Sequence, residues 1–111
     1  MATETQPRPH LLDSKPALDD LIASEERLLV EFHTKGCSLC EAMAPVLDAV
    51  AKGTDATVAT MNPRDDPVLV DEYDVRSVPK LLLFVDGELV ETLEDGFVPV
   101  EDVRAFVTET E

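Results

Sequence analysis

The sequence predicts an α/β fold whose central four-stranded mixed sheet carries helices on both faces. Segments with the pattern of buried strands alternate with segments of helical periodicity, which is typical of parallel strand pairing. Towards the C-terminal end, two apolar segments flank Asp86-Gly87, a preferred pair for a tight hairpin, and this hairpin adds an antiparallel edge. The 111 residues are enough for one domain with one hydrophobic core.

The expected elements follow one another from residue 14 onward. Residues 1–13 show no periodicity, so we expect a flexible N-terminal arm there and a folded domain over 14–111. Helices are expected where apolar residues recur three or four positions apart, and strands where short apolar runs are bounded by charge or turn residues. The expected helices begin after Ser14 and cover 38–52, 67–75 and 99–109; the expected strands cover 27–33, 56–62 and the two arms of the hairpin in 80–94.

The charge balance is strongly acidic. There are 24 Asp and Glu residues against 9 Lys and Arg, which gives a formal net charge of −15. Such a chain repels nucleic acids and anionic membranes, and acids spread over the whole sequence are typical of cytosolic proteins from salt-loving microbes. No apolar run reaches the roughly 20 residues that span a bilayer, and the first residues lack a secretory pattern. We therefore expect a cytoplasmic, halophilic protein that binds neither nucleic acid nor membranes; the alternative to the halophilic interpretation is a merely acidic, soluble protein.

Cys37 and Cys40 are the only cysteines, and they stand where the strand 27–33 gives way to a helix. A helix N-terminus carries a partial positive charge and unpaired N–H groups, which stabilise a thiolate at Cys37. Cys40 lies one turn further along the helix. The two-residue gap allows the sulfurs to bond while one of them stays exposed. This pattern favours a redox pair in which Cys37 attacks a disulfide and Cys40 resolves the intermediate.

Three other interpretations of the cysteine pair remain open at this point. A structural disulfide is disfavoured by the expected cytosolic location and by the very short loop that it would close. Half of a zinc site would need two more ligands, and His10 and His33 are the only other candidates of the usual type. The cysteines can also be ordinary helix residues. A C-x-x-C at a strand–helix junction makes the redox pair the preferred hypothesis.

Two longer segments resemble a known family. The segment "LLVEFHTKGCSLCEAMAPVLDAVA" is similar to the active-site strand and helix of thioredoxins, and "EYDVRSVPKLLLFVDGELVETLEDG" is similar to their cis-proline segment, edge hairpin and late glycine. The resemblance covers roughly residues 14–109. It implies a thioredoxin-like fold and a thiol–disulfide oxidoreductase that reduces protein disulfides. The alternatives are a non-catalytic thioredoxin-like binding or adaptor module and a glutaredoxin-like thiol enzyme.

The resemblance assigns roles to several residues. Cys37 matches the nucleophilic cysteine and Cys40 the resolving cysteine. Pro45 matches the proline that kinks the active-site helix, and Pro79 matches the cis-proline that faces the disulfide. Val78, just before it, would offer backbone groups to an extended substrate strand. Glu31 matches a buried acid, usually Asp, that helps to move the proton of the inner thiol.

The sequence also departs from the family pattern. Ser38-Leu39 stands where the usual pair is Gly-Pro, and Gly36 and His33 replace two tryptophans. A lysine common near the buried acid is replaced by Thr60, and Lys80 follows the cis-proline in place of Thr. The intervening pair tunes the redox potential, so the direction of electron flow stays open. The resemblance implies that substrate is bound by Val78, Pro79, Gly36, Ser38, Leu39 and Gly96.

The resemblance implies no metal or nucleotide cofactor, because the redox group would be the Cys37–Cys40 disulfide itself. The partners that it implies are protein disulfides and an electron donor similar to thioredoxin reductase. We expect the protein to be a monomer.

Overall fold

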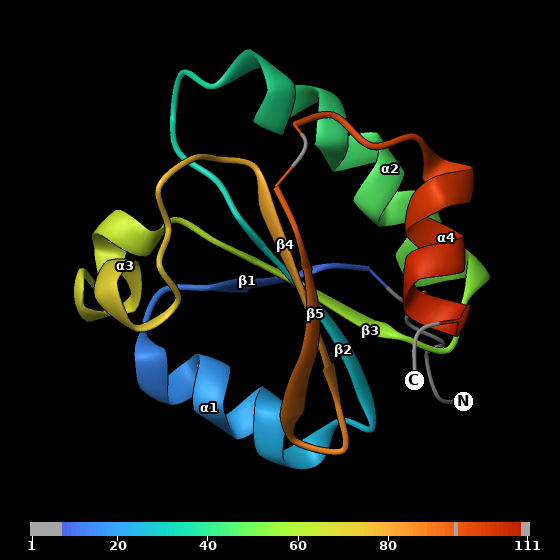
Figure 1. Ribbon diagram of the computed structural model, residues 1–111, viewed down its shortest axis with the longest axis horizontal. Helices are drawn as coiled ribbons and strands as arrows, with labels where there is room; N and C mark the ends of the chain where they lie inside the picture. The colour runs from blue at the N-terminus through green and yellow to red at the C-terminus, as the bar shows by residue number, and fades with distance from the viewer. Residues whose placement is uncertain (1–7, 95, 110–111) are drawn as a thin grey trace, which may run out of the picture.

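The structure, a computed structural model, describes residues 8–94 and 96–109, and its core is a five-stranded mixed sheet with helices on both faces (Figure 1). The strand order is β1-β3-β2-β4-β5. β2 is parallel to β3 and antiparallel to β4, β1 is parallel to β3, and β5 is antiparallel to β4. The strands are β1 His10–Leu12, β2 Arg27–Phe32, β3 Thr57–Met61, β4 Lys80–Val85 and β5 Glu88–Leu93. The helices are α1 Lys15–Ser24, α2 Ser38–Gly53, the short 3₁₀ helix η1 Pro63–Asp65, α3 Val68–Glu72 and α4 Val100–Glu109.

The predicted fold class is confirmed, but two details of the prediction are wrong. The sheet has a fifth strand, and it comes from the segment that we expected to be a flexible arm. Residues His10–Leu12 pair in parallel with β3, with Leu11 opposite Thr60, and this pairing satisfies the backbone groups of an otherwise free edge. Three residues are too few for a periodic pattern, and Leu11 is 84% exposed, so no apolar alternation marks the strand. Residues 1–7 of the expected arm lie outside the described residues.

The strand β2 occupies the centre of the sheet, and its sequence explains why. Every residue of β2 after Arg27 is buried, as expected for a strand with neighbours on both sides and helices on both faces. Successive side chains point to opposite faces. Leu29 lies in the core beneath α2 and α4, whereas Leu28 and Phe32 lie in the core beneath α1 and α3. Glu31 shares its face with Leu29, so its carboxyl group is buried on the α2 side.

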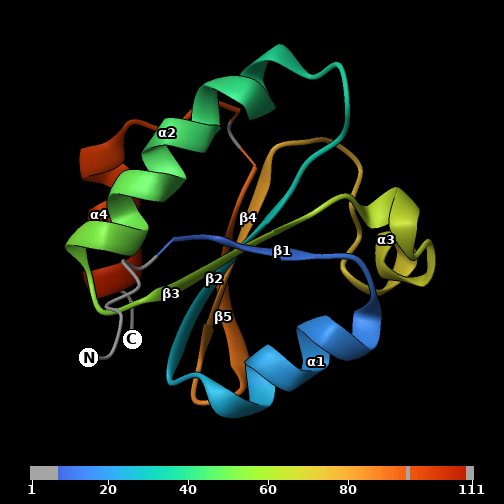
Figure 2. The ribbon, with the colours of Figure 1, turned by 180° about the vertical axis from the view of Figure 1, so that it is seen from behind.

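The two helical layers cover opposite faces of the sheet (Figures 1 and 2). Both views show α2 and α4 together on one face and α1 and α3 on the other. Burial of a Leu, Met or Phe side chain contributes about 1.5–3 kcal/mol, so both layers are held mainly by apolar contacts. The largest buried residues of the α2–α4 layer are Leu29, Met43, Leu47, Leu81, Leu83 and Phe106.

The local predictions hold for the active-site helix and the hairpin. α2 begins at Ser38 with Cys37 as its N-cap, includes Pro45, and ends one residue later than expected. Asp86 and Gly87 have φ values of 52° and 87°, as a tight hairpin turn requires. The third helix is shorter than the predicted 67–75, because Asp74 adopts a positive φ of 53° soon after Glu72 and turns the chain away. Within residues 8–94 and 96–109, no helix combines the length and the apolarity needed to cross a membrane.

Candidate active site

Cys37 and Cys40 form a disulfide at the N-terminal end of α2. Cys37 is the N-cap residue, and its Sγ accepts a hydrogen bond from the backbone N–H of Cys40 at 3.1 Å. Cys40 is only 7% exposed, whereas Cys37 is half-buried at the edge of the site. The two Cα atoms are 5.2 Å apart, within the normal range for a disulfide. The geometry therefore makes one sulfur accessible and hides the other, as the sequence predicts.

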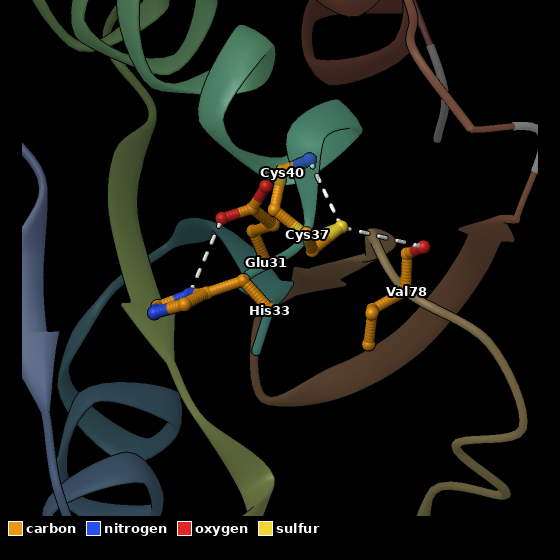
Figure 3. Close-up of a disulfide and its surroundings, with 5 residues drawn as sticks. All are labelled: Glu31, His33, Cys37, Cys40 and Val78. Atoms are coloured by element: carbon orange, nitrogen blue, oxygen red, sulfur yellow. Dashed lines mark hydrogen bonds and ion pairs between the residues drawn. A yellow bond between two sulfur atoms is a disulfide. The ribbon is translucent and has the colours of Figure 1, made fainter. Parts of the chain in front are cut away.

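The segment before β4 faces the outer sulfur. The Val78–Pro79 peptide bond is cis, as expected, and Cys37 Sγ lies 4.0 Å from the carbonyl oxygen of Val78 (Figure 3). In the disulfide this is a contact only, since the sulfur carries no proton. Pro79 has no N–H group, so no donor is added next to the sulfurs. Both views of the ribbon show the start of α2 beside the segment that leads into β4.

Lys80 anchors this segment, a role that sequence reasoning missed. The residue is 3% exposed, and Nζ donates to the backbone carbonyls of Tyr73 at 2.8 Å and Asp74 at 3.0 Å. Nζ also forms an ion pair with Glu94 Oε2 at 2.7 Å. The ammonium group thus ties the chain between α3 and β4 to the end of β5. The available signal was a lysine at the start of a strand that is otherwise entirely apolar.

Glu31 is buried behind the disulfide, and its carboxylate has few partners. The residue is 3% exposed, and its Oε2 has no hydrogen-bond partner. Its Oε1 lies 3.5 Å from Nδ1 of His33, the residue after β2 (Figure 3). A cavity of about 480 Å³ opens beside both side chains and reaches Cys40. Buried polar atoms are normally paired, so this unpaired carboxylate oxygen, beside a cavity that Cys40 also lines, makes Glu31 a candidate functional residue.

The other residues expected to bind substrate lie next to the cysteines in the chain, apart from Gly96, which comes after β5. Gly36 has a φ of 76° and open space beside its Cα, and Ser38 is exposed. Leu39 is 46% exposed. Gly96 has a φ of 81°, and a Cβ atom there would lie 3.4 Å from Leu39 Cδ1, so the two segments touch. Phe97, the neighbour of Gly96 in the chain, is 44% exposed, and sequence reasoning missed it.

The two histidines come from different segments of the chain, one on β1 and one directly after β2. His10 is exposed on β1, whereas His33 lies beside Glu31. Cys37 and Cys40 are bonded to each other. Among residues 8–94 and 96–109, no group of three or more His, Cys, Asp or Glu side chains is placed to hold a metal ion.

Comparison with known proteins agrees with this geometry. The thioredoxin family model matches residues 11–109. A thioredoxin from Porphyra purpurea is 35% identical over 82 residues, which cover 72% of this chain and 76% of that protein. A thioredoxin from Mycoplasmoides gallisepticum is 26% identical over 94 residues, covering 84% and 93% of the two chains. Among solved structures, a mutant thioredoxin from Halobacterium salinarum superposes with a TM-score of 0.89 and 31% identity over 98% of this chain and 97% of that one.

The matched region contains the whole site. It includes the strand that carries Glu31, the helix that begins at the disulfide, and the cis-proline segment. A Cys-x-x-Cys disulfide in this setting performs thiol–disulfide exchange. With the family model covering residues 11–109, the chain belongs to the thioredoxin family.

Proposed function

We propose that this thiol–disulfide oxidoreductase reduces disulfides of other proteins in the cytoplasm, with Cys37 as nucleophile and Cys40 as resolving thiol. The observation that carries the proposal is the asymmetry of the pair: Cys37 lies at the edge of the site and contacts Val78, whereas Cys40 is 7% exposed. A substrate disulfide can reach only the outer sulfur. The inner sulfur can then reach only Cys37.

In the first step, the Cys37 thiolate attacks a substrate disulfide. The positive end of α2 and the N–H group of Cys40 stabilise the thiolate. A bond forms between Cys37 and one substrate sulfur, and the other substrate sulfur leaves and takes up a proton from water. The substrate chain would lie as an extended strand against Val78 and Pro79.

In the second step, Cys40 attacks Cys37 Sγ. The bond between Cys37 and the substrate breaks, its electron pair leaves with the substrate sulfur, and the Cys37–Cys40 disulfide forms. The thiol proton of Cys40 goes to Glu31, which has one unpaired carboxylate oxygen and lines the same cavity as Cys40. Two cysteine thiols are oxidised and one substrate disulfide is reduced.

The surface around the outer sulfur would select the substrate. We propose that Gly36, Ser38, Leu39 and Gly96 bind it together with Val78 and Pro79. Ser38 can donate a hydrogen bond to a thiolate, and Leu39 supplies an apolar contact. The chain would act as a monomer, and a thioredoxin reductase would return electrons to the disulfide.

The formal net charge of −15 supports the proposal that the protein functions at high salt concentration, where salt screens its self-repulsion. The halophilic setting is further supported by the likeness to the Halobacterium salinarum structure.

The test is reduction of insulin disulfides with a thioredoxin reductase as electron source, at low and at molar salt. We expect turnover that is higher in molar salt, loss of turnover in Cys37→Ser, and a trapped mixed disulfide in Cys40→Ser. Absence of turnover at both salt concentrations, with the reductase shown to reduce the disulfide, would favour a binding or adaptor module. Turnover driven by glutathione alone would favour a glutaredoxin-like enzyme.

A further inference from the structure

His33 continues the line of β2 and places its ring beside the Glu31 carboxylate. Its backbone N–H donates to the carbonyl of Met61 at 3.0 Å, which extends the pairing of β2 with β3 by one residue. Residues two apart on a strand share a face, so His33 and Glu31 point to the same side. The distance from His33 Nδ1 to Glu31 Oε1 is 3.5 Å (Figure 3).

The imidazole lies between a buried and an open region. Nδ1 is buried and has no hydrogen-bond partner, yet the side chain as a whole is 32% exposed. The exposed surface therefore belongs to other atoms of the side chain. A histidine that serves packing alone would be expected to have its buried nitrogen paired. His33 instead places an unpaired nitrogen 3.5 Å from a carboxylate oxygen, while its side chain is partly open to solvent.

His33 is the basic residue that lies beside the Glu31 carboxylate. Among the described residues, no other basic side chain has a nitrogen within 4 Å of that carboxylate. The cavity wall also holds Lys35, Glu41 and Asp48; Lys35 and Glu41 are exposed, and Asp48 is paired with Lys52 at 2.9 Å. β3 contributes Thr60, which does not ionise near neutral pH, and α2 contributes Cys40.

We propose that His33 carries the proton between Glu31 and solvent during the second step of the reaction, an inference that rests on the function proposed above. When Cys40 attacks Cys37, the proton of the Cys40 thiol moves to the Glu31 carboxylate. His33 Nδ1 accepts it from Glu31, and the ring releases a proton to water at Nε2. The electron pair of the broken bond leaves with the substrate sulfur. Release of the Nε2 proton to water returns His33 to its neutral form. Imidazole suits this task because it gains and loses protons between pH 5 and 8.

The test uses a disulfide whose two halves are released in separate steps. Reduced protein is mixed in a stopped-flow instrument with one equivalent of dithiobis(nitrobenzoate). The first coloured thiolate leaves when Cys37 attacks, and the second leaves when Cys40 resolves the mixed disulfide. Cys40→Ser should retain only the first phase, which identifies the second.

We expect His33→Gln to slow the second phase about tenfold near pH 7 and to leave the first unchanged. This decrease in rate is smaller than the decrease of about 10²–10⁴-fold that follows removal of a group that transfers a proton directly to or from the substrate. In His33→Gln, the rate of the second phase should depend less steeply on pH between about pH 5.5 and 7.5. In His33→Ala, added imidazole should restore the rate. The matched control is His10→Gln, which alters the only other histidine and should behave as wild type.

An unchanged second phase in His33→Gln, with the same pH profile, would overturn the proposal. So would a slow phase that keeps its pH profile and that imidazole does not restore in His33→Ala, because that result means a structural role. If the wild-type protein lacks the second phase altogether, the proposed function fails, and this outcome is distinct from failure of the role of His33.

Discussion

The ammonium group of Lys80 forms an ion pair with Glu94 at 2.7 Å although its side chain is only 4% exposed. The same nitrogen binds the carbonyls of Tyr73 and Asp74. Because Lys80 directly follows Pro79, these bonds fix the segment that faces the disulfide. The site therefore has two supports: α2 holds the sulfurs, and Lys80 holds the surface opposite them.

Lys80→Met should destabilise the protein and slow substrate reduction. The carbonyl groups of Tyr73 and Asp74 lose their hydrogen-bond donor, so the free energy of unfolding should decrease by about 1–3 kcal/mol. Urea denaturation measures the stability, and insulin reduction measures the activity. The matched control is Lys52→Met, which removes an exposed ion pair with Asp48 and should cost only about 0.3–0.5 kcal/mol. Equal effects of the two substitutions would contradict the anchoring role of Lys80.

The two cysteines should react with alkylating agents at very different rates. In the reduced protein at pH 7, Cys37 should react with iodoacetamide about tenfold faster than a free cysteine, because the start of α2 stabilises its thiolate. Cys40 should react far more slowly, since it is 7% exposed. Mass spectrometry of timed samples from Cys37→Ser and Cys40→Ser gives each rate separately. Similar rates for the two sulfurs would show that burial and the helix end do not distinguish them.

Sequence reasoning placed the cysteine pair and the hairpin turn correctly because their signals are local. The position of Cys37 and Cys40 after a strand, and the Asp86-Gly87 turn, depend on near neighbours in the chain, and both are confirmed. The strand β1 was missed because its three residues are held by backbone pairing with β3, which leaves no side-chain pattern.

The contacts of Lys80 and His33 were missed for a different reason. Glu94 is 14 positions from Lys80, and only the folded sheet brings them together. His33 and Glu31 are near neighbours, but their shared burial depends on α2 covering that face of β2. The sequence offers only weak signals, a lysine in an otherwise apolar strand and a histidine two positions after a glutamate, and neither signal identifies the contact.

Stability should fall above about pH 10 because of Tyr73, the only tyrosine in the chain. Burial raises the pKa of Tyr73 above its ordinary value of 10.0, and the nearby charges of Glu72 and Asp19 add to the effect. The folded state therefore keeps the phenol proton at a pH where the unfolded state has lost it, so the stabilisation present below pH 10 is lost as the pH rises through the folded pKa. The ring packs near Phe32 and Phe84, with centroids 5.8 and 6.1 Å away.

Tyr73→Phe should lose less stability than wild type between pH 9 and 11, as thermal unfolding at each pH would measure. Absorbance of the single phenolate gives the titration directly. A titration midpoint at or below that of free tyrosine would contradict the predicted shift.

Removal of the Glu31 carboxyl should make the protein more stable and less active. Burial of a carboxylate with an unpaired oxygen is unfavourable, so Glu31→Leu should raise the free energy of unfolding by about 1–3 kcal/mol. The same substitution should slow release of the second thiolate from dithiobis(nitrobenzoate) by about 10²-fold, since no group then accepts the Cys40 proton.

Glu31→Gln is the matched variant, because it keeps the shape and the polarity of the side chain but removes the acid. It should slow the second phase as much as Glu31→Leu does and gain less stability, since a buried polar group remains. Urea denaturation and stopped-flow kinetics at pH 7 separate the two effects. A Glu31→Gln protein with a normal second phase would mean that the carboxyl group acts through shape alone, and Cys40 would then lose its proton by another route through the cavity.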